Sequence, residues 1–400
     1  MNTKKISIGL LVLVLILGSG IFFYSHIVKK ESMRNATAPI SQLSSITSAE
    51  EQEVVKIIRP TSGYGAKRAT TAKNQEALLN FIQKQMTSEF GIYTNFLDTD
   101  ENQDVATGHE VLSESAGLLL RYSALAKDKK LFDQTWSKAL KVFNDQDQFS
   151  YRFSPKKKKL YPVNAVVDDL RLVRGLFEGN QAFGVKEYSD LGKTYGSRLL
   201  TTNIQGDEMV DFHDSQTDQR NQFVTLCYID LRTLKLLSLP DNEKQTLLTE
   251  QERILTGGYL GDTFPLYQTR YDYQKKTYFD SEEINVVESL LTILRLAEVN
   301  QAKTESLNFV KQQVANGKLA NRYSPTGKVT DTNQSAAAYG IAAMIASEVG
   351  DQEFYDLAMD HMEASQINDS ASPLNGGYGD VSTQAAFSFN NLIALLTYQY

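Results

Sequence analysis

The sequence has few of the residues that crosslink a chain or bind metals. It holds one cysteine, Cys227, and four histidines in 400 residues. A single cysteine excludes an intrachain disulfide, and no Cys/His cluster has the spacing of a metal site. No Ser-His-Asp order and no nucleophile elbow occurs either. We therefore expect a protein without metal or cofactor, in which Cys227 is a small buried hydrophobic residue.

Positive charge is also scarce. The chain has 41 Lys and Arg against 48 Asp and Glu, for a net charge of −7 and an isoelectric point of about 5.3. Part of the positive charge lies in the N-terminal tail, so the remainder is more acidic still. This balance argues against nucleic acid as a partner. With 42% hydrophobic and 22% charged residues the composition is globular, and we expect a monomer.

One long hydrophobic run stands near the N-terminus. It is uncharged, rich in Leu, Val and Ile, and follows Lys4 and Lys5. About 19 such residues just suffice to cross a bilayer. A polar stretch without a sustained period comes next. Cleavage near residues 36–38, followed by secretion, is the alternative to an uncleaved anchor in the cell membrane. We expect a cytoplasmic tail at 1–5, a transmembrane signal anchor at 6–24, an extracellular linker at 25–70 and one folded domain at 71–400.

From residue 71 onward the hydrophobic pattern predicts about twelve helices with short breaks between them. No strand-rich block interrupts the series. Helices paired by short turns predict hairpins that close into a ring, an (α/α)6 barrel, with an open-ended α-solenoid as the alternative. The predicted helices cover 71–86, 107–126, 131–143, 164–177, 186–201, 222–237, 241–255, 279–297, 302–314, 333–349, 353–364 and 383–399.

An aromatic, extended segment precedes three of these helices. The segments are 152–155 (RFSP), 271–278 (YDYQKKTY) and 322–325 (RYSP), and each leads through a basic turn or directly into a helix start. Loops that repeat in this way lie on one face of a ring. We therefore expect them to line a groove with Tyr and Phe.

Glu114 lies on the apolar stripe of the helix predicted at 107–126. It is three residues from Val111 and four from Leu118, so all three side chains share one helix face. Burial disfavours a charged carboxylate and raises its pKa, which makes Glu114 a candidate proton donor. The alternative is a Glu at the edge of the stripe that meets an Arg. We expect residues 107–110 to form the capping box of this helix.

Further carboxylates stand where other helices are predicted to begin. Asp168 and Asp169 precede one apolar run, and Asp280 precedes another. Such residues often cap a helix, and Asp280 with Glu283 has the spacing of a capping box. A third acidic group, at 207–214, lacks the spacing of a Ca²⁺ site, and we expect a solvated loop there.

These three segments resemble glycoside hydrolase family 8. Residues 113–119 (SESAGLL) resemble the family's Ser-Glu-Gly-Gln-Gly-Tyr-Gly-Met segment, 168–176 (DDLRLVRGL) its Asp-x-Asp helix, and 278–284 (YFDSEEI) its Tyr-Asp-Ala-x-Arg-Val-Pro segment. The family contains (α/α)6-barrel, inverting endo-glycanases. The resemblance implies that Glu114 is the general acid, that Asp169 binds the distorted sugar, and that Asp280 is the general base.

The likeness spans about residues 75–400 but is incomplete. Ser115 and Ala116 replace a Gly and a Gln, Val167 replaces the first Asp of the Asp-x-Asp pair, and the Arg and Pro of the third segment are missing. Asp169 against Asp168, and Asp280 against Glu282, therefore stay open. The chain looks closer to membrane-attached Gram-positive relatives that trim a self-made exopolysaccharide than to the cellulases.

The resemblance implies an extracellular, endo-acting hydrolase of an exopolysaccharide or a β-1,4-linked glycan. An inverting reaction needs two carboxyl groups roughly 6.5–9.5 Å apart on opposite faces of the sugar. A non-catalytic glycan-binding or export-accessory protein on the same barrel is the first alternative, and an eliminating enzyme the second. The residues that we expect to contact substrate besides the catalytic ones are Asp168, Tyr122, Tyr259, Tyr278 and Tyr378.

Overall fold

The computed structural model describes residues 54, 57–58, 61–102 and 105–400. The predicted anchor at 6–24 and most of the predicted linker at 25–70 lie outside these residues. Within the described part of the chain, no helix is both long and apolar enough to cross a bilayer.

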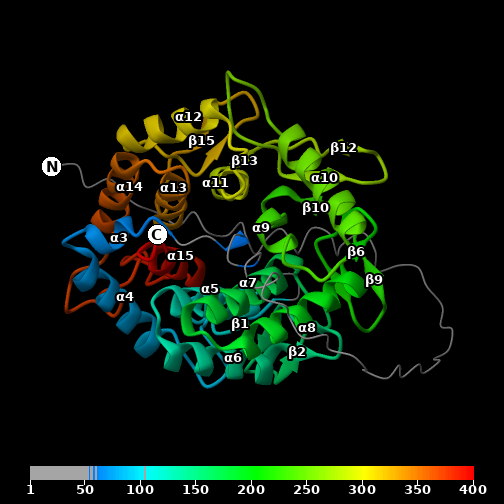
Figure 1. The fold of residues 1–400 in the computed structure, drawn as a ribbon. Helices are drawn as coiled ribbons and strands as arrows, with labels where there is room; N and C mark the ends of the chain where they lie inside the picture. Colours follow the sequence, from blue (N-terminus) through cyan, green and yellow to red (C-terminus); the bar gives the residue numbers. More distant parts are fainter. Residues whose placement is uncertain (1–53, 55–56, 59–60, 103–104) are drawn as a thin grey trace.

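The helices form two concentric rings (Figure 1). A short helix, α3 (Tyr64–Lys67), precedes the first pair. The outer ring consists of α4 (Thr71–Gln85), α6 (Lys129–Phe143), α8 (Lys186–Thr202), α10 (Asp241–Gly257), α12 (Thr304–Ala315) and α14 (Gln352–Ala364). The inner ring consists of α5 (Ser113–Leu125), α7 (Val166–Phe183), the 3₁₀ turn η1 (Leu226–Tyr228) with α9 (Leu231–Leu234), α11 (Val286–Ala297), α13 (Ala336–Glu348) and α15 (Ser388–Thr397). This arrangement is the predicted (α/α)6 barrel.

The sequence explains which helices lie inside. The inner helices are apolar on nearly every side, and α11 and α13 are buried almost from end to end. The outer helix α6 instead buries one face, with Phe132, Trp136 and Ala139 turned inward. Since a helix that is hydrophobic all round needs neighbours on every side, it takes the centre of the barrel.

Short strands connect the rings on the side where the inner helices begin. Three three-stranded antiparallel sheets share one plan: a strand that leads into an inner helix pairs with a hairpin that precedes the next inner helix. They are β1 (Val111–Leu112) with β4 (Arg152–Ser154) and β5 (Lys159–Leu160); β10 (Phe223–Thr225) with β11 (Arg270–Asp272) and β12 (Thr277–Tyr278); and β13 (Ile284–Asn285) with β14 (Arg322–Tyr323) and β15 (Val329–Asp331).

These hairpins contain the three aromatic segments at 152–155, 271–278 and 322–325, so the predicted repeat is confirmed. Lys158, Lys276 and Gly327 occupy the left-handed region in or beside the hairpin turns. Three further hairpins complete this side of the ring: β2 (Asn144–Asp145) with β3 (Gln148–Phe149), β6 (Ile204–Gln205) with β7 (Glu208–Met209), and β8 (His213–Asp214) with β9 (Gln219–Arg220).

Strand pairing also shortens three predicted helices. The helix predicted from 107 begins at Ser113, and the helix predicted from 279 begins at Val286. The helix predicted at 222–237 is a strand, a 3₁₀ turn and a single helical turn. In each case the residues before the helix form ladder hydrogen bonds with a distant segment, which a helix would not allow.

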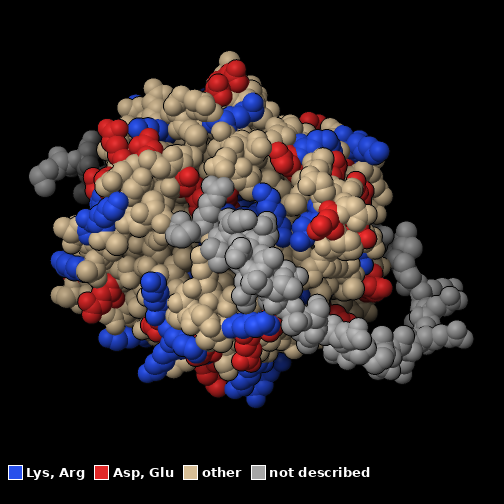
Figure 2. All heavy atoms as spheres, in the orientation of Figure 1, with Lys and Arg blue, Asp and Glu red and all other residues tan. Residues whose placement is uncertain are grey.

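The predicted capping box at 107–110 forms only in part: Glu110 Oε2 accepts a 3.0 Å hydrogen bond from Thr107 N, but the helix begins later, at Ser113. Glu110 is fully buried and receives two hydrogen bonds from Arg152 on β4, at 2.8 and 2.7 Å. Its carboxylate therefore fastens the start of β1 to the neighbouring hairpin. Figure 2 shows acidic and basic side chains interspersed on the face that it presents, without a broad surface of one sign.

Candidate active site

The first turns of the inner helices carry four buried carboxyl groups. They are Glu114 on α5, Asp168 and Asp169 on α7, and Glu288 on α11, each between 5 and 7% exposed. We call this set the first-turn carboxyls. Strand pairing joins the segments that lead into α5 and α7, and those that lead into η1 and α11, while Asp211 bonds to both Val166 and Thr225, so these groups share one end of the barrel. The partial positive charge of a helix N-terminus favours carboxylates at such positions.

Glu114 shares one guanidinium with Asp168. Arg171 Nη1 lies 3.3 Å from Glu114 Oε2 and 2.6 Å from Asp168 Oδ1. The helices approach closely enough for this because Gly117 has no side chain: a Cβ there would lie 2.9 Å from the Cβ of Arg171. Glu114 is thus a buried carboxyl that pairs with an Arg at the end of the barrel where the inner helices begin.

The charges around Glu114 and Asp168 decide which of the two carboxyl groups keeps a proton. Burial raises the pKa of Glu114 to about 7; Arg171 opposes the rise, and Asp168 adds to it. One guanidinium cannot neutralise two buried carboxylates, so one of them keeps a proton more readily than in water. Asp168, at 2.6 Å from Arg171, has the better ion pair. Glu114 is therefore suited to hold the proton and to donate it.

Asp168 and Asp169 differ in their contacts. Asp168 is held by Arg171 and by a 3.4 Å hydrogen bond from Ser113 Oγ. Asp169 Oδ2 accepts a 2.8 Å hydrogen bond from Asn164 Nδ2, and its Oδ1 is buried without a hydrogen-bond partner in the described part of the chain. Burial raises the pKa of Asp169 well above its usual range. Of the two, Asp169 has an oxygen left to accept a hydroxyl group from a ligand.

Asp280 occupies a different environment. It is exposed in the segment between β12 and β13, as is Glu282. Glu283 pairs with Arg322 at 2.7 Å. The N-cap of α11 is Asn285, whose Oδ1 accepts from the backbone N–H groups of Val287 and Glu288. The predicted capping box of Asp280 and Glu283 is therefore wrong, because the helix begins later than the pattern indicated.

Two buried carboxyl groups on this side were missed as site residues. Glu288 stands on an apolar helix stripe as Glu114 does, and that signal was available in the sequence. Asp211 was assigned to a solvated loop but is 1% exposed: its carboxylate accepts 2.6 Å hydrogen bonds from the backbone N–H and the hydroxyl of Thr225. Burial raises the pKa of Asp211 to about 6. His213, in the same predicted loop, is also buried.

The predicted tyrosines lie at different depths. Tyr122 is buried in the core and accepts a 2.9 Å hydrogen bond from Gln75. Tyr259 and Tyr278 are half-buried; the hydroxyl of Tyr278 donates to the Ile254 carbonyl at 2.7 Å, and that of Tyr259 to Asp262 at 2.9 Å. Tyr378 is buried, but it borders a pocket at the starts of α13 and α15.

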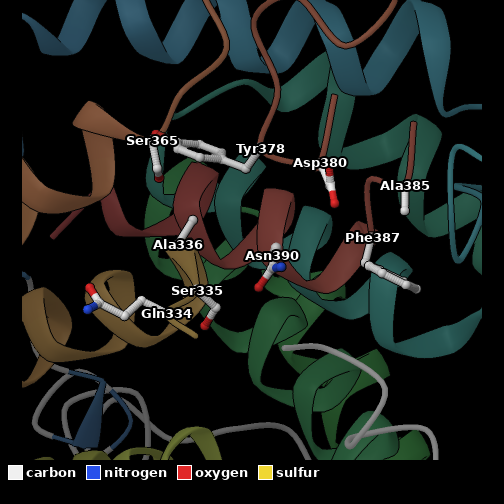
Figure 3. A pocket seen from close by; sticks show the side chains of 10 residues that line it. Gln334, Ser335, Ala336, Ser365, Tyr378, Asp380, Ala385, Phe387 and Asn390 are labelled. Atoms are coloured by element: carbon white, nitrogen blue, oxygen red, sulfur yellow. The ribbon is translucent and has the colours of Figure 1, made fainter. Parts of the chain in front are cut away.

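Figure 3 shows this pocket, with Ser335, Asp380, Phe387 and Asn390 around it. Asn390 Oδ1 is buried and has no hydrogen-bond partner among the described residues. The pocket lies beside helix starts, like the first-turn carboxyls. Across the described residues, no group of three His, Cys, Asp or Glu side chains has the arrangement of a metal site.

Solved structures similar to this chain include carbohydrate-active enzymes. No model of a protein family matches the chain. A Clostridium perfringens protein described as a novel alpha-amylase is 30% identical; the match covers 82% of this chain and 97% of that one, with a TM-score of 0.75. Endoglucanase Cel10 of Klebsiella pneumoniae, a family 8 glycosyl hydrolase, shares the fold at 14% identity, covering 80% and 97% with a TM-score of 0.58.

A curated relative agrees in length. It is the putative lipoprotein YdaJ of Bacillus subtilis, 25% identical over 346 residues, which cover 83% of this chain and 91% of that protein. Together with the ring of six helix pairs and the carboxyl groups at its inner helix starts, these likenesses identify the protein. The chain belongs to the six-hairpin glycoside hydrolases of family 8 and is an enzyme that acts on glycans.

Proposed function

We propose that this enzyme cleaves within a polysaccharide chain by direct attack of water, with Glu114 as general acid. The observation that carries the proposal is the state of Glu114: a buried carboxyl in the first turn of α5 whose pKa burial raises to about 7. A group with this pKa holds a proton near neutral pH and can release it to the oxygen of a glycosidic bond.

Asp169 has the second role. Its unpartnered Oδ1 accepts a hydroxyl of the sugar at the cleavage point, which fixes the ring against Glu114. Asp168 holds Arg171 in place and acts through it. A further carboxylate must take a proton from the attacking water on the other face of the sugar. The family resemblance assigns this step to Asp280, and the first turn of α11 offers Glu288 as well.

The substrate is a hydroxyl-rich glycan. The 30% identical relative described as an alpha-amylase favours an α-linked glucan. The sequence motifs favour an exopolysaccharide or a β-1,4-linked glycan. Half-buried Tyr259 and Tyr278, and the pocket at Asn390, supply aromatic and hydrogen-bonding surface beyond the cleavage point.

We place the enzyme outside the cell and attached to the membrane. The relative YdaJ is described as a putative lipoprotein, which supports membrane attachment. In this chain the hydrophobic run at 6–24 serves as the anchor, 25–70 as the linker and 71–400 as the catalytic domain.

Release of reducing ends by the full chain tests the proposal. The panel is starch, a soluble β-1,4-glucan and the exopolysaccharide of the producing organism. We expect release from at least one glycan and a loss on the order of 10²–10⁴-fold in Glu114→Gln, the range of a general acid. Glu187→Gln, an exposed first-turn carboxylate of the outer helix α8, is the matched control and keeps wild-type activity.

Two outcomes contradict the proposal. Binding of a glycan without release indicates a non-catalytic binding protein. Release with a new ultraviolet absorbance indicates elimination and an unsaturated product. The anomeric configuration of the first product, read by proton NMR, tests inversion separately, since direct attack of water reverses the configuration at C1.

A further inference from the structure

Glu288 lies where a carboxyl group does not help the fold. All residues of α11 from Val286 to Ala297 are buried, and most of them are apolar. Glu288 is 5% exposed, and its Oε1 has no hydrogen-bond partner within the described residues. An unsatisfied buried carboxyl destabilises a protein, so one that stands among other first-turn carboxyls calls for a functional explanation.

The surroundings of Glu288 fit a group that alternates between two protonation states. Burial raises the pKa of Glu288 to about 7, and the negative charge of Asp211 adds to the rise. Arg270 and Arg322 oppose it, as does a hydrogen bond from Thr269. The charges of the two arginines therefore favour the ionised form, while burial and Asp211 favour the protonated form.

Asp211 links Glu288 to the Glu114 side of the site. The backbone carbonyl of Asp211 accepts a 2.9 Å hydrogen bond from Val166 N at the start of α7. Its side chain binds Thr225, which precedes η1 and stands opposite Arg270 in the β10–β11 ladder. Asp211 therefore fixes the first turn of α7, which carries Asp168 and Asp169, against the segment that faces Glu288.

Tyr228 is a further buried polar residue between α7 and α11. It is buried at the end of η1, which packs against α11. The charges of both Asp211 and Asp168 contribute to the raised pKa of its hydroxyl, and Arg171 opposes them. Charged groups from the starts of α5, α7 and α11 thus act on one another in this region: Arg171 bonds to Glu114 and Asp168, and the charge of Asp211 acts on both Tyr228 and Glu288.

Resting on the proposed hydrolysis, we propose that Glu288, rather than Asp280, is the general base that takes a proton from the attacking water. Glu288 stands in the first turn of an inner helix, as Glu114 and Asp169 do, with a buried oxygen that accepts no hydrogen bond from the described residues. Asp280 is exposed outside these first turns, on the segment before β13.

The reaction balances with these two groups. The water oxygen forms a bond to C1 of the sugar while the bond from C1 to the glycosidic oxygen breaks. Glu288 takes one proton from the water, and Glu114 gives its proton to the leaving oxygen. The products are a new reducing end and a free hydroxyl. Glu288 then loses its proton to solvent and Glu114 regains one, which restores the starting state.

The test compares Glu288→Gln and Asp280→Asn in the full chain, on the glycan that the wild type hydrolyses. We expect Glu288→Gln to lower kcat on the order of 10²–10⁴-fold with little change in KM. The acidic limb of the pH profile disappears, because no group remains that must lose a proton. Azide restores part of the chain cleavage, since this anion attacks C1 without a base; its product is a glycosyl azide with no reducing end, so the rescue is measured as shortening of the chain by mass spectrometry. We expect Asp280→Asn to lose much less activity than Glu288→Gln and to gain nothing from azide, and Glu187→Gln to match the wild type.

Other results overturn the inference. If Glu288→Gln keeps its activity, Glu288 is not the base. If Asp280→Asn loses activity and azide rescues that variant, Asp280 is the base. Glu288→Asp guards against a folding defect: it keeps a carboxyl and is expected to retain partial activity with an acidic limb. If Glu288→Gln loses activity without azide rescue and with its acidic limb intact, Glu288 has a structural role. Absence of release by the wild type contradicts the proposed hydrolysis as well.

Discussion

Two sets of buried charges lie on the same inner helices, one or more turns apart. The first-turn carboxyls stand at the helix starts, with Arg171 as the guanidinium that bonds to them. Farther along the helices lies a second set, which we call the ion-pair network. In the network four arginines face four carboxylates: Arg121, Arg174, Arg232 and Arg295 with Glu178, Asp230, Glu298 and Glu348.

The two sets differ in how completely they are paired. In the network, Arg174 reaches Glu298 at 2.6 Å, Glu178 at 2.9 Å and Asp230 at 3.3 Å. Neighbouring arginines hold the pKa values of Asp230 and Glu298 below their usual range despite burial. In the first-turn set, burial dominates and the pKa values of Glu114 and Glu288 rise to about 7.

This difference separates a structural role from the catalytic one that we propose. The network holds as many guanidinium groups as carboxylates, so its charges stay fixed and join α5, α7, α9, α11 and α13 at the centre of the barrel. The first-turn carboxyls outnumber their partners, so at least one of them exchanges its proton near neutral pH. Similar side chains on the same helices thus serve different purposes because of their partners.

The largest effect on stability is expected in the network. Arg174→Met removes the cation from three buried carboxylates and lowers the free energy of unfolding by about 3–5 kcal/mol. Urea denaturation measures the change. Arg253→Met is the surface control: it breaks a pair with Glu250 in which the Arg side chain is half exposed, and it costs less than about 1 kcal/mol. Equal stability of the two variants would contradict a structural role of the network.

At the helix starts we expect a smaller effect on stability. There the buried carboxyl groups destabilise the folded chain when they ionise, whereas the ionised carboxylates of the network stabilise it. The pKa values of Glu114 and Glu288 are about 7 in the folded chain against an ordinary 4.5, so the folded state binds these protons more tightly than the unfolded state does. Stability from this source is present at low pH and is lost as pH rises from about 4.5 to about 7. The loss is on the order of 1–3 kcal/mol per group.

Replacing both groups sharpens this prediction. In the Glu114→Gln, Glu288→Gln double variant the contribution is absent, so the melting temperature falls less between pH 5 and pH 8 than it does in the wild type. Thermal unfolding followed by circular dichroism across this range measures the slope. A double variant with the slope of the wild type would show that these carboxyls are not the ones with raised pKa values.

Asp211 belongs to neither of the two sets. We expect its replacement to have the smallest effect on the free energy of unfolding. Its carboxylate lies on the catalytic side but is fully used by Thr225. Asp211→Asn keeps one acceptor oxygen, and the Thr225 hydroxyl can turn to accept from the new amide. The expected loss is about 0.5–1.5 kcal/mol, measured by urea denaturation. A loss as large as that of Arg174→Met would assign Asp211 to the structural set.

Much of the fold was predictable because it depends on local patterns. Hydrophobic periodicity gave the paired helices, and the aromatic segments gave three extended stretches before helix starts, though not their pairing into sheets. The burial of Glu114 was predictable as well, since a carboxylate on an apolar stripe is visible in a single helix. The helix starts at Ser113 and Val286 were not, because they depend on pairs such as Val111 with Phe153, which are remote in sequence.

The rest of the site depends on contacts that no local pattern encodes. Glu288 is buried against Thr269, Arg270 and Arg322, which come from two other segments of the ring. Asp211 looked like part of a solvated loop because its neighbours in sequence are polar, whereas its actual partner is Thr225 on β10. Charge counts likewise gave no indication that one set of buried carboxylates is neutralised and the other is not.

The most direct test of this account measures turnover and melting temperature on the same preparation of Glu114→Gln. We predict that turnover falls by a factor of 10² or more. At pH 8 the melting temperature stays equal to that of the wild type or rises, because the variant removes a buried, poorly neutralised charge. Unchanged turnover would contradict the assignment of Glu114 as the acid. A loss of turnover together with a lower melting temperature would place Glu114 with the structural ion pairs.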